Sequence, residues 1–207
     1  FSTILLPLLI SCSAGGDPSV LQTDSSEPGH SDQTSSGTDT GGNIPEPSNV
    51  AVETEWVEAS GNQIFVQYYS PTHCTKDAPC PAVLLAPSKQ NAGVDEFSCC
   101  GKKLAAALDA TVITYNPPGR GVDGEQSTGE EDFGGRDGQD MLKDVANSLR
   151  KRLFVDESNF GVVSLGNGVA DASGALARFH ATSLSFVGYY IDIEGPTNRC
   201  FMTQSPF

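Results

Sequence analysis

"FGVVSLGNGVA", Phe160–Ala170, is the most informative segment of this chain for predicting its fold. It opens with apolar and β-branched residues, a pattern typical of a strand buried inside a sheet. Small residues follow at Ser164, Gly166 and Gly168, where the chain has to turn sharply. The sequence "GVADASGALARF" comes next and spaces its apolar residues as a helix does: Val169, Ala172, Leu176 and Phe179. The stretch therefore predicts a buried strand that turns tightly into a helix.

Further strands and helices alternate along the chain on both sides of this turn. We expect strands at 62–71, 81–87, 111–119 and 184–193, with Trp56 and Val57 on a strand before the first. Helices are expected at 102–110 and 139–153, and a loop at 88–101. The alternation predicts the α/β class, with a mostly parallel central sheet flanked by helices and right-handed crossovers.

Two of these segments carry sharper expectations. In the helix at 139–153, five apolar residues share one face: Met141, Leu142, Val145, Leu149 and Leu153. The segment at 184–193 is expected to be a fourth buried strand, because it is apolar over most of its length.

The N-terminal part of the chain reads as an export signal followed by a spacer. "FSTILLPLLISCSAGG" is an apolar run that ends in small residues and is too short to span a bilayer. Residues 13–50 are mainly Ser, Thr, Gly, Asp, Glu and Pro, which cannot offset the entropy of ordering by burial. His30 lies in this tract and is expected to be solvated.

Leu9-Ile10-Ser11-Cys12 resembles the bacterial lipobox, which implies cleavage before Cys12 and lipidation of that cysteine. The predicted organisation is a signal peptide at 1–11, a lipidated cysteine and spacer at 12–50, and a folded domain at 51–207. Since Ser13 rather than Asp follows the cysteine, the resemblance implies the outer membrane or cell surface as the location. The chain begins with Phe and lacks a basic n-region, so we expect its start to be missing.

The charge distribution excludes one class of partner. The formal net charge is −14 at pH 7, and no Lys or Arg precedes Lys76. A chain without a basic stripe is a poor nucleic-acid binder, so no nucleic-acid partner is expected.

The cysteines indicate a disulfide and disfavour a metal site. Cys74 and Cys80 close the short loop "CTKDAPC", and a disulfide between them suits an exported protein. Cys99 and Cys100 are adjacent, so at most one of them easily reaches a distant partner such as Cys200; which of the three pair stays open. The spacing matches no C-x-x-C pair, so we expect no metal and no cofactor.

The order of these features resembles the α/β-hydrolase superfamily over residues 51–199. An N-terminal strand pair precedes "APSKQNAG", where the family has its oxyanion-hole loop, and "YNPPGRG", where it has a glycine-rich turn. The strand-turn-helix at 160–170 then stands where the family has its nucleophile elbow, G-x-S-x-G. A dinucleotide-binding fold is the competitor, but its glycine-rich turn should come early in the sheet and this one comes late.

The resemblance places the family's nucleophile at Gly166, because Ser164, Gly166 and Gly168 fill the small positions of the elbow. Glycine has no side chain with which to attack. Centring the motif on Ser164 instead puts the bulky Val162 where a small residue is needed, and Ser164 remains the alternative nucleophile. Centring it on Asn167 fails in the same way and offers only an amide.

The sequence also offers only weak candidates for the acid and the base of a Ser-His-Asp triad. Asp192 or Glu194 stands at a strand end where the family can place its acid. The histidines of the domain, His73 and His180, do not match the late loop that carries the family's base. The family adds two more strands after the fourth buried one, so we expect the chain to be C-terminally incomplete.

Taken together, the sequence predicts an envelope-anchored α/β-hydrolase-like lipoprotein that is inactive as sequenced, with the membrane and a small ester or peptide as its partners. The alternative is a fragment of an active ester or peptide hydrolase, with Ser164 as nucleophile and a base beyond the C-terminus.

Overall fold

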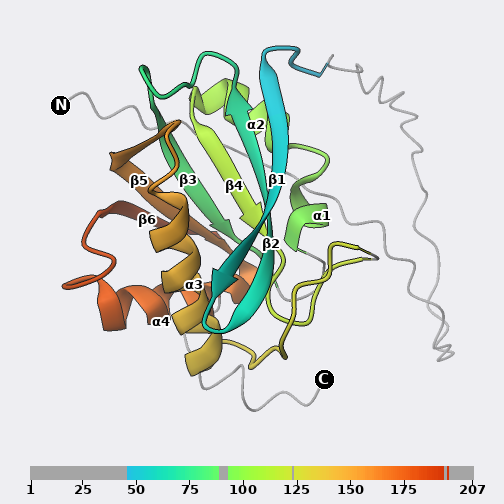
Figure 1. Ribbon diagram of the computed structural model, residues 1–207. Coiled ribbons are helices and arrows are strands. Elements are labelled where there is room, and N and C mark those ends of the chain that lie inside the picture. The colour runs from blue at the N-terminus through green and yellow to red at the C-terminus, as the bar shows by residue number, and fades with distance from the viewer. Residues whose placement is uncertain (1–45, 89–92, 123, 194, 196–207) are drawn as a thin grey trace, which may run out of the picture. The chain divides into compact units, whose positions relative to one another are not determined.

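The computed structural model describes residues 46–88, 93–122, 124–193 and 195, which lie within one compact unit, Asn43–Phe207. Six strands form one sheet in the order β1-β2-β4-β3-β5-β6 (Figure 1). The strands are β1 (Val50–Ala59), β2 (Asn62–Pro71), β3 (Cys80–Ala86), β4 (Thr111–Tyr115), β5 (Val155–Leu165) and β6 (Val187–Ile193). β1, β2 and β4 pair antiparallel, whereas β4, β3, β5 and β6 run parallel. The predicted α/β class is confirmed.

Helices cover both faces of the sheet. They are α1 (Gly93–Phe97), α2 (Gly101–Leu108), α3 (Arg136–Leu149) and α4 (Val169–Phe179), with a short 3-10 turn η1 (Gly166–Gly168) before α4. α3 and α4 pack on the face that carries Leu84 and Val162. α1 and α2 pack on the opposite face, against Val83 and Leu85. Successive residues of β3 therefore enter different cores, which is why this strand is apolar throughout.

The last strand differs from the sequence expectation. The segment 184–193 was predicted to be a buried strand, but β6 begins only at Val187, and Tyr189, Ile191 and Ile193 are 40%, 49% and 39% exposed. β6 pairs with β5 on one side and is the edge strand of the described sheet. An apolar run indicates a strand but not whether a neighbour covers it, and this explains the error.

Two helix predictions also need correction. Leu153 does not lie on the apolar face of α3, because the helix ends at Leu149 and Leu153 is 66% exposed in the turn before β5. The segment 88–101, predicted to be a loop, contains α1 and the first residue of α2. A helix of five residues is too short for hydrophobic periodicity to reveal.

Candidate functional site

The backbone at Gly166 has the geometry of a sharp strand-to-helix turn. Leu165, the last residue of β5, is extended, with φ −117° and ψ 133°. Gly166 has φ +47°, and α4 begins three residues later at Val169. This left-handed region is rare for residues with a side chain. Gly166 therefore has a positive φ at the predicted tight turn between a strand inside the sheet and a helix.

Different constraints act at the two glycine positions of the turn: the backbone conformation at Gly166 and close packing at Gly168. A Cβ at Gly168 would lie 2.5 Å from the carbonyl oxygens of both Ala86 and Pro87, so the start of α4 touches the end of β3 directly. Among the residues that the structure describes, a Cβ at Gly166 would meet only the Cβ of Ser88, at 3.4 Å. Packing therefore requires glycine at position 168. Position 166 has room for a side chain, which would point toward Ser88.

Ser164 lies before the turn, inside β5. It shares the sheet face of Val162, under the layer formed by α3 and α4, and its exposure is 0%. Its hydroxyl donates to Asp192 Oδ1 at 3.2 Å and lies 2.9 Å from the Tyr190 hydroxyl. Ser164 and Asp192 are direct neighbours in the parallel register of β5 and β6. The fold thus brings together two predicted site residues, but it buries the hydroxyl.

A polar cluster that the sequence did not indicate lies in the loops beside Gly166. The Ser88 amide donates to Glu96 Oε2 at 2.9 Å, and its side chain also bonds Glu96. Arg120 Nη1 donates to the Ser88 carbonyl oxygen at 2.7 Å. The guanidinium also forms a bidentate ion pair with the Glu131 carboxylate. Burial raises the pKa of Glu96, although the bonds from Ser88 and the charge of Arg120 act in the opposite direction.

The acid-rich loop at 121–135 was the only sequence signal for this cluster. It contains Glu131 among several carboxylates, and nothing in their spacing shows which of them meets Arg120.

Neither described histidine stands beside the turn. His73 follows β2 at the end of the sheet where β3 begins, about 20 Å away along a strand of this length. His180 is the C-cap of α4, about 16 Å along the helix from its start. Glu194, the other candidate acid, lies outside the described residues. Within the described part of the chain, the Ser164–Asp192 contact therefore has no imidazole partner.

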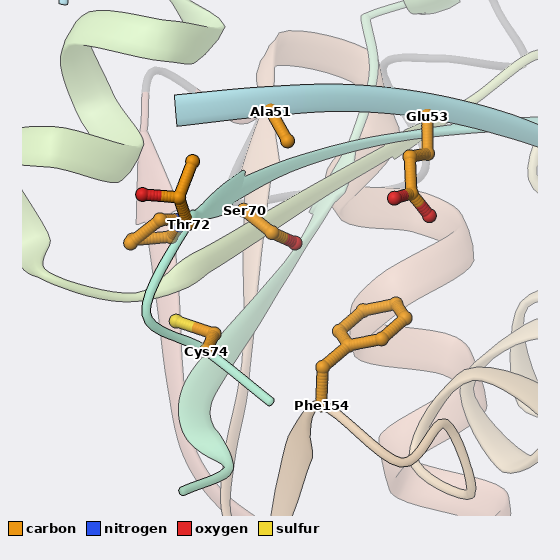
Figure 2. A pocket seen from close by; sticks show the side chains of 7 residues that line it. Ala51, Glu53, Ser70, Thr72, Cys74 and Phe154 are labelled. Atoms are coloured by element: carbon orange, nitrogen blue, oxygen red, sulfur yellow. The ribbon is translucent and has the colours of Figure 1, made fainter. Parts of the chain in front are cut away.

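The opposite end of the sheet carries the predicted disulfide. Cys74 and Cys80 are bonded, with their Cα atoms 5.4 Å apart, so this pairing is confirmed. Cys99 is an exposed free thiol, while Cys12 and Cys200 lie outside the described residues. Cys74 also borders a surface hollow of about 170 Å³, shown in Figure 2. The lining residues are Ala51, Glu53, Ser70, Pro71, Thr72, Cys74 and Phe154.

Comparisons with known proteins found similar folds among solved structures. No family model matches the sequence, and no curated protein matches it either. A thermostable carboxylesterase cloned from a metagenomic library matches with TM-score 0.60 at 17% identity, over 75% of this chain and 50% of that one. An esterase from Pyrobaculum calidifontis matches with TM-score 0.57 at 22% identity, over 76% and 48%. Vibralactone cyclase matches with TM-score 0.56 at 12% identity, over 74% and 45%.

These solved structures have the α/β-hydrolase fold, and at such identities the likeness shows the fold alone. The chain spans about half or less of the length of each of the three. The resemblance inferred from the order of motifs is thus supported for the fold.

Proposed function

We propose that this chain is an envelope-anchored protein of the α/β-hydrolase fold that binds a small ester or peptide without hydrolysing it. The single observation that carries the proposal is Gly166. Its backbone has the positive φ of a nucleophile elbow, and position 166 has room for a side chain. Since glycine supplies no hydroxyl or thiol, the position cannot form a covalent intermediate.

The burial of Ser164 supports the same proposal. A nucleophile has to reach a substrate carbonyl, and Ser164 has no exposed surface. Its hydroxyl is held by Tyr190 and Asp192, so it acts as a polar link between β5 and β6.

The Ser164–Asp192 bond also favours a second candidate, an ester or peptide hydrolase that uses Ser164. The carboxylate accepts the proton that a base would have to remove. In such a hydrolase, Ser164 would have to become exposed, and a base would have to come from residues that the structure does not describe. The first proposal requires neither change.

One polar cluster indicates which class of ligand the site would favour. It consists of Ser88, Glu96, Arg120 and Glu131. It holds two carboxylates against one guanidinium and lies where a side chain at 166 would point. Excess carboxylate favours ligands with hydrogen-bond donors or positive charge, such as the amide and amine groups of a peptide.

The anchor is the part of the proposal that concerns residues outside the structure. None of the described helices is long and apolar enough to cross a bilayer. The proposal assigns membrane attachment to a lipid on Cys12, because Leu9-Ile10-Ser11-Cys12 resembles a lipobox and a polar spacer follows at 13–50. In a bacterial host, from a gene with a complete signal, the protein should incorporate palmitate and sediment with membranes. Cys12→Ala should abolish the labelling; soluble protein with an unaltered Cys12 would overturn the anchor.

The catalytic part is tested with a fluorophosphonate probe and an activated ester. We expect no labelling and no hydrolysis above background, with a known serine esterase as positive control. The matched variants are Ser164→Ala and Ser158→Ala, which change a buried and a surface serine of the same strand. Labelling that only Ser164→Ala abolishes would establish the second candidate. Labelling that Ser88→Ala abolishes would reject both.

A further inference from the structure

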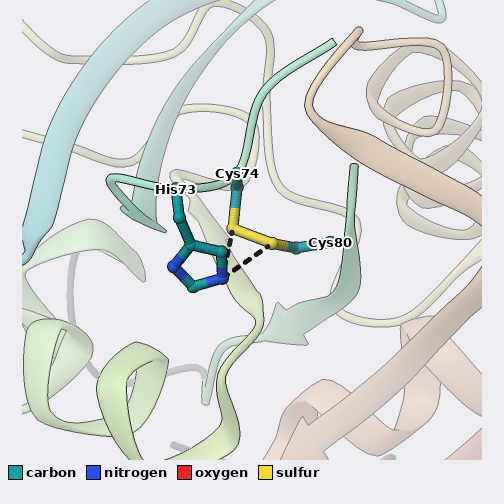
Figure 3. Close-up of side chains that lie close together, drawn as sticks. All are labelled: His73, Cys74 and Cys80. Carbon is teal, nitrogen blue, oxygen red and sulfur yellow. Dashed lines mark hydrogen bonds between the residues drawn. A yellow bond between two sulfur atoms is a disulfide. The ribbon is translucent and has the colours of Figure 1, made fainter. Parts of the chain in front are cut away.

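One cluster of ligating atoms lies far from the Gly166 turn, where the parallel strands begin (Figure 3). His73 Nε2 lies 3.9 Å from Cys74 Sγ and 3.6 Å from Cys80 Sγ. The same nitrogen lies 3.4 Å from Asp109 Oδ1. The four residues come from the turn after β2, the first residue of β3 and the C-cap of α2. The two sulfurs and the imidazole nitrogen all lie within 4.8 Å of one another, and the Asp109 carboxylate contacts this group through His73.

The separations from the imidazole nitrogen match those around a tetrahedral zinc ion. With Zn–N of about 2.05 Å and Zn–S of about 2.3 Å, nitrogen and sulfur ligands stand about 3.6 Å apart. A nitrogen and a carboxylate oxygen stand about 3.3 Å apart in the same geometry. The observed separations, 3.6 and 3.9 Å to the sulfurs and 3.4 Å to the oxygen, fit this arrangement. Metal binding by all four residues requires that the Cys74–Cys80 bond break and that the exposed Asp109 carboxylate move toward the sulfurs.

We propose that reduction of the Cys74–Cys80 disulfide converts this cluster into a zinc site, with His73, Cys74, Cys80 and Asp109 as ligands. The oxidised chain has a disulfide there and binds no metal, whereas the reduced chain binds one Zn²⁺. The inference is independent of the proposed hydrolase-like function, because it uses none of the residues around Gly166.

The redox step balances with a dithiol as the reductant. One reductant thiolate attacks Cys74 Sγ, the disulfide breaks, and Cys80 leaves as a thiolate that takes up a proton. The second reductant thiol then attacks the mixed disulfide and releases Cys74. The reductant becomes a disulfide by losing two electrons and two protons, and the protein gains both as two thiols. Zn²⁺ binding afterwards releases those two protons to solvent.

The surroundings allow the attack and the movement that follows it. Cys74 borders the surface hollow of Figure 2, so a small dithiol can approach its sulfur, whereas Cys80 is 5% exposed. Residues 75–79, which join the two cysteines, are all exposed. The loop can therefore let the sulfurs move to about 3.8 Å apart, as zinc requires, without disturbing the core.

The ligand set selects the metal class. Two thiolates and an imidazole suit Zn²⁺, whereas Mg²⁺ and Ca²⁺ prefer oxygen ligands. Asp109 adds a third negative charge and fills the fourth position. No C-x-x-C pair marks a zinc site in the sequence, because residues from the turn after β2, from β3 and from the end of α2 form this one.

The test uses the full chain with Cys12, Cys99, Cys100 and Cys200 changed to Ser, so that Cys74 and Cys80 are the only cysteines. The protein is titrated with Co²⁺ before and after reduction by a phosphine, which does not compete as a thiol ligand. We expect thiolate-to-cobalt charge-transfer absorption and tetrahedral ligand-field bands only after reduction, at one Co²⁺ per chain, with Zn²⁺ displacing the Co²⁺. Absence of these bands in the reduced chain would overturn the proposal.

Variants separate the site from simple dithiol binding. His73→Ala should weaken Co²⁺ binding by at least about tenfold, because even lost outer-shell partners cost about 10–100-fold. Asp109→Asn should also weaken it, whereas Asp77→Asn, an exposed carboxylate in the same turn, should not. Unchanged affinity in His73→Ala would reject the site, and unchanged affinity in Asp109→Asn would reject the fourth ligand.

A thermal measurement covers the case in which reduction loosens the fold. Zn²⁺ should raise the Tm of the reduced parent, or restore its near-ultraviolet circular dichroism if the reduced chain unfolds. It should do neither for the oxidised parent or for reduced His73→Ala. A reduced parent that does not respond to Zn²⁺ would contradict the proposal.

Discussion

The two ends of the parallel sheet differ in how shape and chemistry are combined. At the carboxyl end, the strand-turn-helix around Gly166 has a positive-φ backbone at the turn, and the turn residue has no side chain. At the amino end, an imidazole contacts both the disulfide between Cys74 and Cys80 and the carboxylate of Asp109. The comparison teaches that backbone geometry and reactive groups are set by separate residues, so either can occur without the other.

The physical basis of each end explains this separation. The carboxyl-end turn depends on the contact of Gly168 with the end of β3, which does not involve the residue at the nucleophile position. The amino-end cluster depends on a short loop that the Cys74–Cys80 disulfide closes. This loop geometry keeps His73 beside the two sulfurs. Four sets of substitutions test this difference between the two ends.

Gly168→Val should have the largest effect. Its Cβ would lie 2.5 Å from two backbone carbonyl oxygens, so α4 has to move away from β3. We expect a loss of about 3 kcal/mol in the free energy of unfolding, measured by urea titration. Gly188→Ala is the control, because its nearest neighbour would be the Phe160 carbonyl oxygen at 3.9 Å. Equal stability of Gly168→Val and Gly188→Ala would show that this contact does not hold the turn.

Replacing both Cys74 and Cys80 by Ser should cost less, about 2 kcal/mol, because the disulfide closes a short loop with a sequence separation of 6. Denaturant midpoints of the oxidised parent and the double variant give this difference. Cys99→Ser changes an exposed thiol and should leave the midpoint unchanged. A double variant as stable as the parent would mean that the disulfide does not stabilise the amino end.

Gly166→Ala should cost about 1 kcal/mol. The position has room for a methyl group, so the expected loss comes from the positive φ alone. Gly166→Asn should lose less, since Asn tolerates this backbone region better than Ala. The same urea titration measures both. A loss as large as that of Gly168→Val would show that packing also restricts position 166.

Gly166→Ser should have the smallest effect, on activity rather than stability. Neither histidine in the described part of the chain lies beside this position, because His73 and His180 lie at the far ends of the sheet and of α4. We therefore expect no ester hydrolysis above the parent's background. Hydrolysis that appears in Gly166→Ser and disappears on adding Glu96→Gln would identify Glu96 as a base and bring catalysis to the carboxyl end.

Local patterns accounted for the parts of the site that depend on neighbours in sequence. The apolar strand and small residues at 160–170 predicted the turn, and the spacing of Cys74 and Cys80 predicted their bond. They did not predict that Ser164 would be buried, because that depends on α4 folding back over its face. They also missed the exposure of β6, which depends on what lies beside it.

The α/β class, the position of the turn and the glycine at its centre could all be predicted from the sequence, since each follows from residues within about one strand or helix length. Tertiary structure alone decided which distant groups meet. It paired Ser164 with Asp192, joined Ser88 to Arg120, and set His73 between the two sulfurs and Asp109. The reason is that strand order and register determine such contacts, and the residues that make a contact carry no local signal of either.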